Sequence, residues 1–104
     1  MNESGLAVSR SVIRDLVALA AIEVPGVLRV GWAGAPWRHL LAGKPIAVRV
    51  RGGVVDARVV VIARPGQALG PLAADVGSAV AAAVERLLGL ALGQVTVRID
   101  GVGG

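Results

Sequence analysis

Residues 46–63 read IAVRVRGGVVDARVVVIA, and this stretch decides the fold. In residues 46–51, branched apolar side chains alternate with alanine or arginine, as in a strand with one buried face. Gly52-Gly53 is a signal for a tight turn, and residues 55–63 are again rich in valine. The stretch therefore predicts a β-hairpin with strands at 46–50 and 55–63.

Two amphipathic helices are predicted, one before and one after this hairpin. Ser9 is a good N-cap for the first helix, whose apolar residues recur at helical spacing. We expect Pro25 to end it and Gly26 to take the left-handed exit from the helix. Gly70-Pro71 opens the second helix, and Gly89 ends it. The apolar stripe of the second helix consists of Leu72, Val76, Val80, Val84 and Leu87 or Leu88.

Shorter apolar segments at 6–8, 27–30 and 94–100 are predicted to be strands. We expect residues 31–44 to form a loop and residues 101–104 a loose tail. The element order is then β-α-β-β-β-α-β, or α-β-β-α-β if the weak strands do not form. Either order predicts an α+β fold with two helices on one face of a small, mostly antiparallel sheet. The whole chain, 1–104, is one domain of this kind, with its core at about 5–102.

The composition restricts the classes of function. The chain has no Cys, which excludes disulfides, thiolate nucleophiles and Cys-based metal sites and fits a cytoplasmic protein. Apolar residues make up 55% of the sequence, and so much apolar surface on a small domain indicates contact with a partner. No apolar run is long enough to span a bilayer as a helix. The net charge of +4 favours an acidic partner: an acidic protein face, anionic lipid or nucleic acid.

The arginines of the hairpin form the sharpest pattern. If Ile46, Val48 and Val50 face the helices, the residues between them point the other way. By this alternation one outer face of the sheet carries Arg49, Arg51, Arg58 and Arg98 together with Val60 and Ile62. A solvated face explains the arginines, whereas a self-association or partner-binding surface explains the arginines and the two branched apolar residues. We therefore expect a partner-binding surface here.

Catalytic and metal-binding residues are not predicted. A single histidine and dispersed carboxylates supply no metal-ligand set, and we expect no cofactor. Asp56 and Asp100 are interpreted as cross-strand ion-pair partners beside Arg58 and Arg98. Glu23, in the last turn of the first helix, is unfavourable to the helix dipole, so we expect compensation from Arg29 or from backbone N–H groups of the Pro25–Val27 turn.

Both tryptophans, Trp32 and Trp37, fall in the predicted loop at 31–44. Two interpretations stay open for them. They cover an open edge of a core that has no Phe or Tyr, or they anchor a partner or a membrane surface.

The order of elements and the residues at their joints resemble the alkaline shock (Gls-type) envelope stress-response family over about residues 5–102. The matching pieces are Ser9-x-x-Val12-Ile13, Ala20-Ala21-x-Glu23-Val24-Pro25-Gly26-Val27, the strands Ile46–Val50 and Asp56–Ile62, the helical positions Val76, Val80 and Val84, and Val95-x-Val97-x-Ile99-x-Gly101-Val102.

The resemblance implies a non-enzymatic, cytoplasmic interaction protein, peripheral to the inner face of the membrane through a partner. That partner would be a membrane-anchored or lipid-metabolism protein, and the chain would also form homo-oligomers. Its arginine content departs from the more acidic and lysine-rich sequences typical of the family. A nucleic-acid-binding module that uses the same arginines is the alternative, weakened by the lack of Phe and Tyr for stacking bases.

Overall fold

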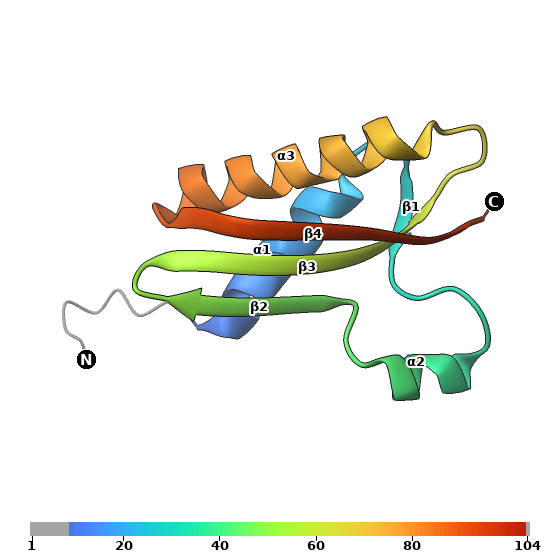
Figure 1. Ribbon diagram of the computed structural model, residues 1–104, viewed down its shortest axis with the longest axis horizontal. Helices are drawn as coiled ribbons and strands as arrows, with labels where there is room; N and C mark the ends of the chain where they lie inside the picture. The colour runs from blue at the N-terminus through green and yellow to red at the C-terminus, as the bar shows by residue number, and fades with distance from the viewer. Residues whose placement is uncertain (1–8, 104) are drawn as a thin grey trace.

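The computed structural model describes residues 9–103 and has the predicted α+β fold (Figure 1). The segment 6–8, predicted to be a strand, lies outside the described residues. In chain order the elements are α1 (Arg10–Ile22), β1 (Val27–Val30), α2 (Pro36–Ala42), β2 (Ile46–Arg51), β3 (Val54–Ala63), α3 (Leu69–Leu88) and β4 (Ala91–Val102).

Strand β3 is the centre of the sheet and pairs with the three other strands. On one edge it pairs in parallel with β4 over its whole length. On the other edge it pairs antiparallel with β2 through residues 54–59 and then with β1 through residues 61–63. Val60, between these two stretches, donates its N–H to the Pro45 carbonyl at 2.8 Å and accepts from the Gly31 N–H at 2.9 Å. Strands β1 and β2 therefore lie one after the other along the same edge of β3. The segment between them starts and ends beside the same residue of β3, Val60.

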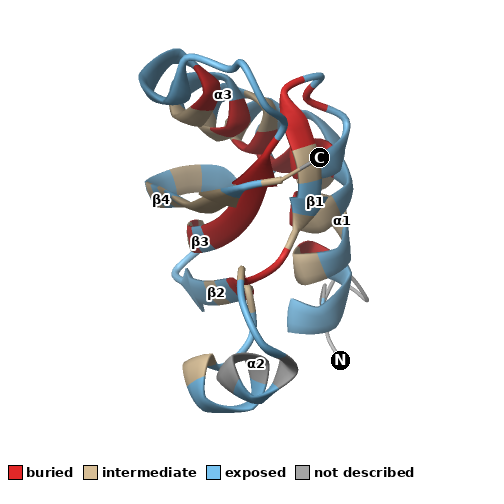
Figure 2. Cartoon of the chain, turned by 90° about the vertical axis from the view of Figure 1, so that its right-hand side faces the viewer, coloured by how far each residue is buried: buried red, intermediate tan, exposed pale blue. Residues whose placement is uncertain are grey.

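Helices α1 and α3 cover one face of the sheet, and the core lies between them and β3 (Figure 2). Alternate residues of β3 face the helices, as period-2 alternation requires. The helix side supplies branched and small side chains that permit close approach to the sheet. The largest fully buried side chains of this core are Ile13, Val17, Val55, Val59, Val61, Val76, Val80 and Val84.

The residues predicted to start, turn or end these elements are largely confirmed. The Ser9 hydroxyl accepts a hydrogen bond from the Val12 N–H at 3.3 Å and caps α1. Gly52 and Gly53 have φ of 55° and 79°, the left-handed pair that a two-residue hairpin turn favours. Gly89 ends α3 with φ of 66°.

The reason expected for Gly26 is wrong. Its backbone is not among those with positive φ, so a left-handed exit does not explain the glycine. A Cβ at this position would come within 2.7 Å of Leu72 Cδ1 and 2.5 Å of Gln67 Oε1. A side chain at this position would force the ends of Leu72 and Gln67 to move, because the turn after α1 packs closely against the start of α3.

Two other expectations are corrected. The predicted loop at 31–44 contains helix α2, which begins with Pro36 at its first turn and has no side-chain cap on Ala35. The predicted tail is also wrong in part, because Gly101 and Val102 continue β4 and pair with Ile62 and Ala63. A Cβ at Gly101 would lie 3.0 Å from that of Ala33, so this glycine permits close packing.

Candidate interaction surface

The outer face of the sheet, opposite α1 and α3, carries the predicted arginines. Arg58 lies between Ala47 of β2 and Thr96 of β4 in the strand register, and Arg49 lies opposite Asp56. The side chains of Arg49 and Arg58 are exposed, and with Ala47 and Thr96 they line part of a shallow concavity. Within residues 9–103, neither arginine makes an ion pair or a side-chain hydrogen bond. This part of the face therefore presents two guanidinium groups to solvent.

Asp56 partly offsets this positive charge at the hairpin end of the sheet. One carboxylate oxygen accepts from the Gln94 backbone N–H at 2.9 Å, and the other accepts from Arg51 Nη2 at 2.8 Å. These two hydrogen bonds, together with the charges of Arg51 and Arg49, lower the pKa of the Asp56 carboxyl below its usual value. Asp56 thus joins β3 to both neighbouring strands.

The expected ion-pair partners are corrected in detail. Asp56 pairs with Arg51 rather than with Arg58, because Arg51 lies diagonally across the β2–β3 ladder. Asp100 does pair with Arg98, but along one strand, with Arg98 Nε 3.1 Å from Asp100 Oδ1. Arg51 and Arg98 are therefore ion-paired with a carboxylate, whereas within residues 9–103 Arg49 and Arg58 are not, although Asp56 lies opposite Arg49.

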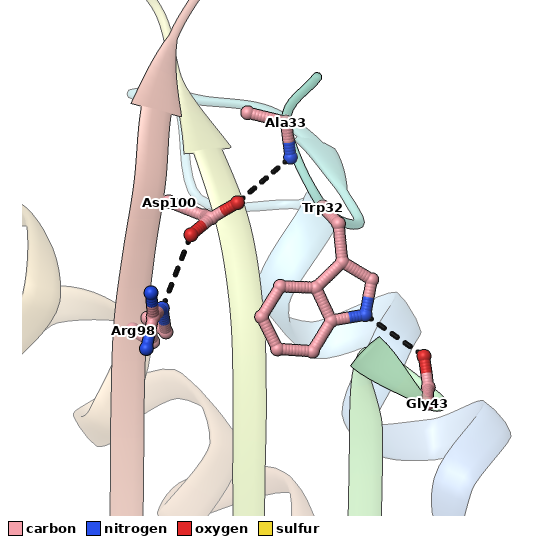
Figure 3. Close-up of polar contacts among 5 residues, drawn as sticks. All are labelled: Trp32, Ala33, Gly43, Arg98 and Asp100. Carbon is pink, nitrogen blue, oxygen red and sulfur yellow. Dashed lines mark hydrogen bonds and ion pairs between the residues drawn. The ribbon is translucent and has the colours of Figure 1, made fainter. Parts of the chain in front are cut away.

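Trp32 lies against the outer face of the sheet, where Figure 3 shows its ring beside β3, between that strand and Gly43. Its indole N–H donates to the Gly43 carbonyl at 2.9 Å, and the Arg98 guanidinium carbon lies 5.7 Å from the ring centroid. Asp100 accepts from the Ala33 N–H at 2.9 Å. These contacts fasten both ends of the segment that bears α2 to the sheet. Of the two interpretations of the tryptophans, the covering role thus describes Trp32, which is only 8% exposed.

Val60 and Ile62 are not accessible, which contradicts the exposed apolar surface expected from them. They lie on the outer face as predicted, since they are absent from the core that α1 and α3 cover. Their exposed fractions are nevertheless 0% and 3%. Positions 101 and 103 approach Ile62, and the backbone of Val60 is bonded to Gly31 and Pro45, the two ends of the segment that includes Trp32. They form a second small core on the outer face, and a partner cannot touch them in this conformation.

Glu23 is the C-cap residue of α1 and is exposed. The expected compensation by Arg29 is wrong, because Arg29 Nη1 instead donates to the Trp32 carbonyl at 3.4 Å. In the part of the chain that the structure describes, Glu23 has no ion pair, and its charge is left to solvent. Pro25 is also exposed, whereas Gly26 is buried.

Two exposed apolar surfaces were missed by the sequence analysis. One is a groove between α1 and α3, lined by Leu16, Ala20 and Ala83 and bordered by Leu19 and Leu87, which are 55% and 64% exposed. The sequence did contain a signal for this groove, because the apolar stripes of α1 and α3 are wider than one buried helix face requires. The other is the apolar face of α2, where Trp37 is 62% exposed; the sequence analysis named Trp37 as a possible anchor but not the helix or its exposed Leu40 and Leu41.

Across residues 9–103, no cluster of three or more His, Cys, Asp or Glu side chains is arranged to hold a metal ion. The helices in that range are also too short or too polar to cross a membrane.

Comparison with known proteins gives one family and one group of similar folds. The model of the alkaline shock protein 23 family, described as having a "cell envelope-related function", matches residues 1–103. The fold is similar to the solved structure "MamM-CTD 215-293", with a TM-score of 0.65 and 17% identity over 89% of this chain and 99% of that one. It is also similar to "MamM CTD - Copper form", with a TM-score of 0.65 and 17% identity over 88% and 85% of the two chains. At this identity the likeness concerns the fold alone. No curated protein sequence matches the chain.

Proposed function

This chain belongs to the alkaline shock protein 23 family, whose function is related to the cell envelope, and from that premise we propose that it is a non-enzymatic interaction protein of the envelope stress response. In this proposal it binds an acidic segment of a membrane-associated or lipid-metabolism protein through Arg49 and Arg58. It acts in the cytoplasm, at the inner face of the membrane when bound to that partner, and it associates with itself.

The exposed pair Arg49 and Arg58 is the observation that supports this function best. Both side chains extend from strands of a rigid sheet, so little backbone order is lost when a partner binds. Guanidinium groups bind carboxylates through two parallel hydrogen bonds, which suits recognition of Asp and Glu side chains. The shallow concavity around them fits a short acidic segment better than a small molecule, which requires a more enclosed site.

The carboxylates on this face support a binding role over catalysis. Asp56 and Asp100 both accept hydrogen bonds from a backbone N–H and from an arginine. At Asp56 these contacts lower the pKa, which makes that carboxylate a weak general base at neutral pH.

The alternative, a nucleic-acid-binding module, has less support. Binding of single strands on a sheet face relies on aromatic rings that stack with bases. Trp32 lies on the outer face, but its ring is covered. The arginines could still contact phosphates, so the experiment below includes nucleic acid.

Charge reversal with a matched control tests the proposal. The full chain and an Arg49→Glu/Arg58→Glu variant would be used to capture proteins from cells of the native host. The control variant is Arg64→Glu/Arg86→Glu, which has the same net charge and changes two exposed arginines elsewhere. Proteins that depend on Arg49 and Arg58 would be identified, purified and titrated by calorimetry.

We expect the first variant to raise the Kd for such a partner by about tenfold or more, with a smaller effect at high salt, and the control to bind as the unaltered chain does. Equal loss in both variants would contradict a specific role for this face. Tight binding of single-stranded oligonucleotides with a steep salt dependence would favour the nucleic-acid alternative. Sedimentation of the purified chain tests self-association, which cannot use Val60 and Ile62 while they are buried.

A further inference from the structure

Helix α2 projects from one end of the molecule and makes no extensive contact with another described helix or strand (Figures 1 and 2). Its apolar residues Trp37, Leu40 and Leu41 are 62%, 86% and 80% exposed. They are spaced i, i+3 and i+4, so they lie on one face of the helix. A face of this kind is costly to leave in water, and no described element covers it.

The ends of this segment are fixed although the helix itself projects. Trp32 before α2 and Gly43 after it are joined by the indole hydrogen bond, and Ala33 is bonded to Asp100 of β4. These bonds hold the segment in a defined position before a partner binds, which reduces the entropy lost on binding.

The charge of the surrounding sequence points to an anionic occupant. Between Glu23 and Asp56 the chain contains no carboxylate, and within this range α2 is accompanied by Arg38 and Lys44. Lys44, which follows the helix, is exposed. Tryptophan and leucine on one face with basic residues nearby is the composition of a segment that lies in the interface of a bilayer with anionic headgroups.

We propose that α2 is a membrane-insertion element: Trp37, Leu40 and Leu41 enter the interface of an anionic bilayer, and the exposed Lys44 that follows the helix contacts its headgroups. This binding requires no protein partner, so it is independent of the role proposed for Arg49 and Arg58. A single short apolar face gives weak binding alone, and the positive charge supplies the second signal that stable attachment needs.

Purified chain and lipid vesicles test this directly. Binding to equimolar phosphatidylglycerol–phosphatidylcholine vesicles would be measured by flotation and by tryptophan emission. Leu40→Ser/Leu41→Ser should lower the vesicle partition coefficient by about tenfold or more, because two inserted side chains lose their apolar transfer. Leu19→Ser/Leu87→Ser is the matched control, since these leucines are also more than half exposed but border the groove between α1 and α3, and it should bind unchanged. Equal urea midpoints would verify that all variants fold.

Emission identifies the inserted residue. With anionic vesicles the unaltered chain should show a blue shift, and Trp37→Phe should abolish it while retaining binding, because the remaining Trp32 is already buried. Failure of the unaltered chain to bind, equal loss in the Leu19/Leu87 control, or equal binding to pure phosphatidylcholine would overturn the proposal. So would a lipid-free dimer that Leu40→Ser/Leu41→Ser converts to a monomer, since the face would then join two copies of the chain.

Discussion

The Arg98 guanidinium lies beside the Trp32 ring, 5.7 Å from its centroid, while Arg98 Nε donates to Asp100. A cation within about 6 Å of an indole is attracted to the ring, and the neighbouring carboxylate holds the guanidinium in position. The interaction joins β4 to the segment before α2. It gives the outer face of the sheet a small covered core of its own.

The first prediction concerns the two tryptophans. Trp32→Ala should lower the free energy of unfolding by about 3 kcal/mol, because a buried ring and its hydrogen bond are lost. Trp37→Ala should change it by about 0.5 kcal/mol or less, since that ring is mostly exposed. Urea unfolding followed by far-ultraviolet circular dichroism measures both. Similar values for the two variants would show that Trp32 does not cover the sheet.

The second prediction concerns the buried pair on the outer face. Val60→Thr should destabilise the chain by about 1–3 kcal/mol, because it buries a hydroxyl among apolar neighbours. Ile62→Lys should prevent folding, since a buried ammonium has no partner there. Val50→Thr, at a position 40% exposed on β2, is the control and should cost about 0.5 kcal/mol or less. A stable, folded Ile62→Lys variant would mean that this face opens to solvent.

The third prediction concerns the acid limit of stability. Hydrogen bonds from the Gln94 N–H and Arg51 lower the pKa of Asp56 in the folded chain. The contribution of Asp56 to the free energy of unfolding is therefore fully present above the usual carboxyl pKa. It is lost as the pH falls through the lower pKa of the folded state. Asp56→Asn should reduce the urea midpoint at about pH 7 and have little effect at about pH 2. An equal reduction at both pH values would exclude the charge of Asp56 as the cause.

The fourth prediction compares two glycines. Gly26→Ala should destabilise by about 1–3 kcal/mol, because its Cβ would be only 2.7 Å from buried Leu72. Gly77→Ala, in the middle of α3, should instead stabilise by about 0.5–1 kcal/mol, since its Cβ would meet only Val97 at 4.0 Å and alanine favours the helix. Thermal unfolding of both variants provides the measurement. Stabilisation by Gly26→Ala would show that the turn after α1 has room to move.

Local patterns in the sequence predicted the elements that depend on local chemistry. The alternation in β2 and the glycine pair at 52 and 53 determine the hairpin, and Ser9 caps the helix as expected. The arginines were placed on the correct face for the same reason, because alternation alone decides which side of a strand a residue occupies.

Long-range packing was not predictable in this way. Alternation placed Val60 and Ile62 on the outer face, but whether that face is open depends on where Trp32 lies, which no periodicity reports. Helix α2 was missed because it has no side-chain cap and is short. Gly101 was interpreted as part of a loose tail, although the close approach of Ala33 is what excludes a side chain there.

Both backbone groups of Val60 bind the flanks of the segment that carries α2, at Gly31 and Pro45. The sheet register is therefore insensitive to the number of residues between those flanks. Lengthening such a closed loop is thermodynamically mild, about 0.6 kcal/mol for each doubling. This point of the fold is thus suited to insertion: selection could extend, shorten or exchange the projecting helix, and with it the surface that the chain recognises, without rebuilding the domain underneath.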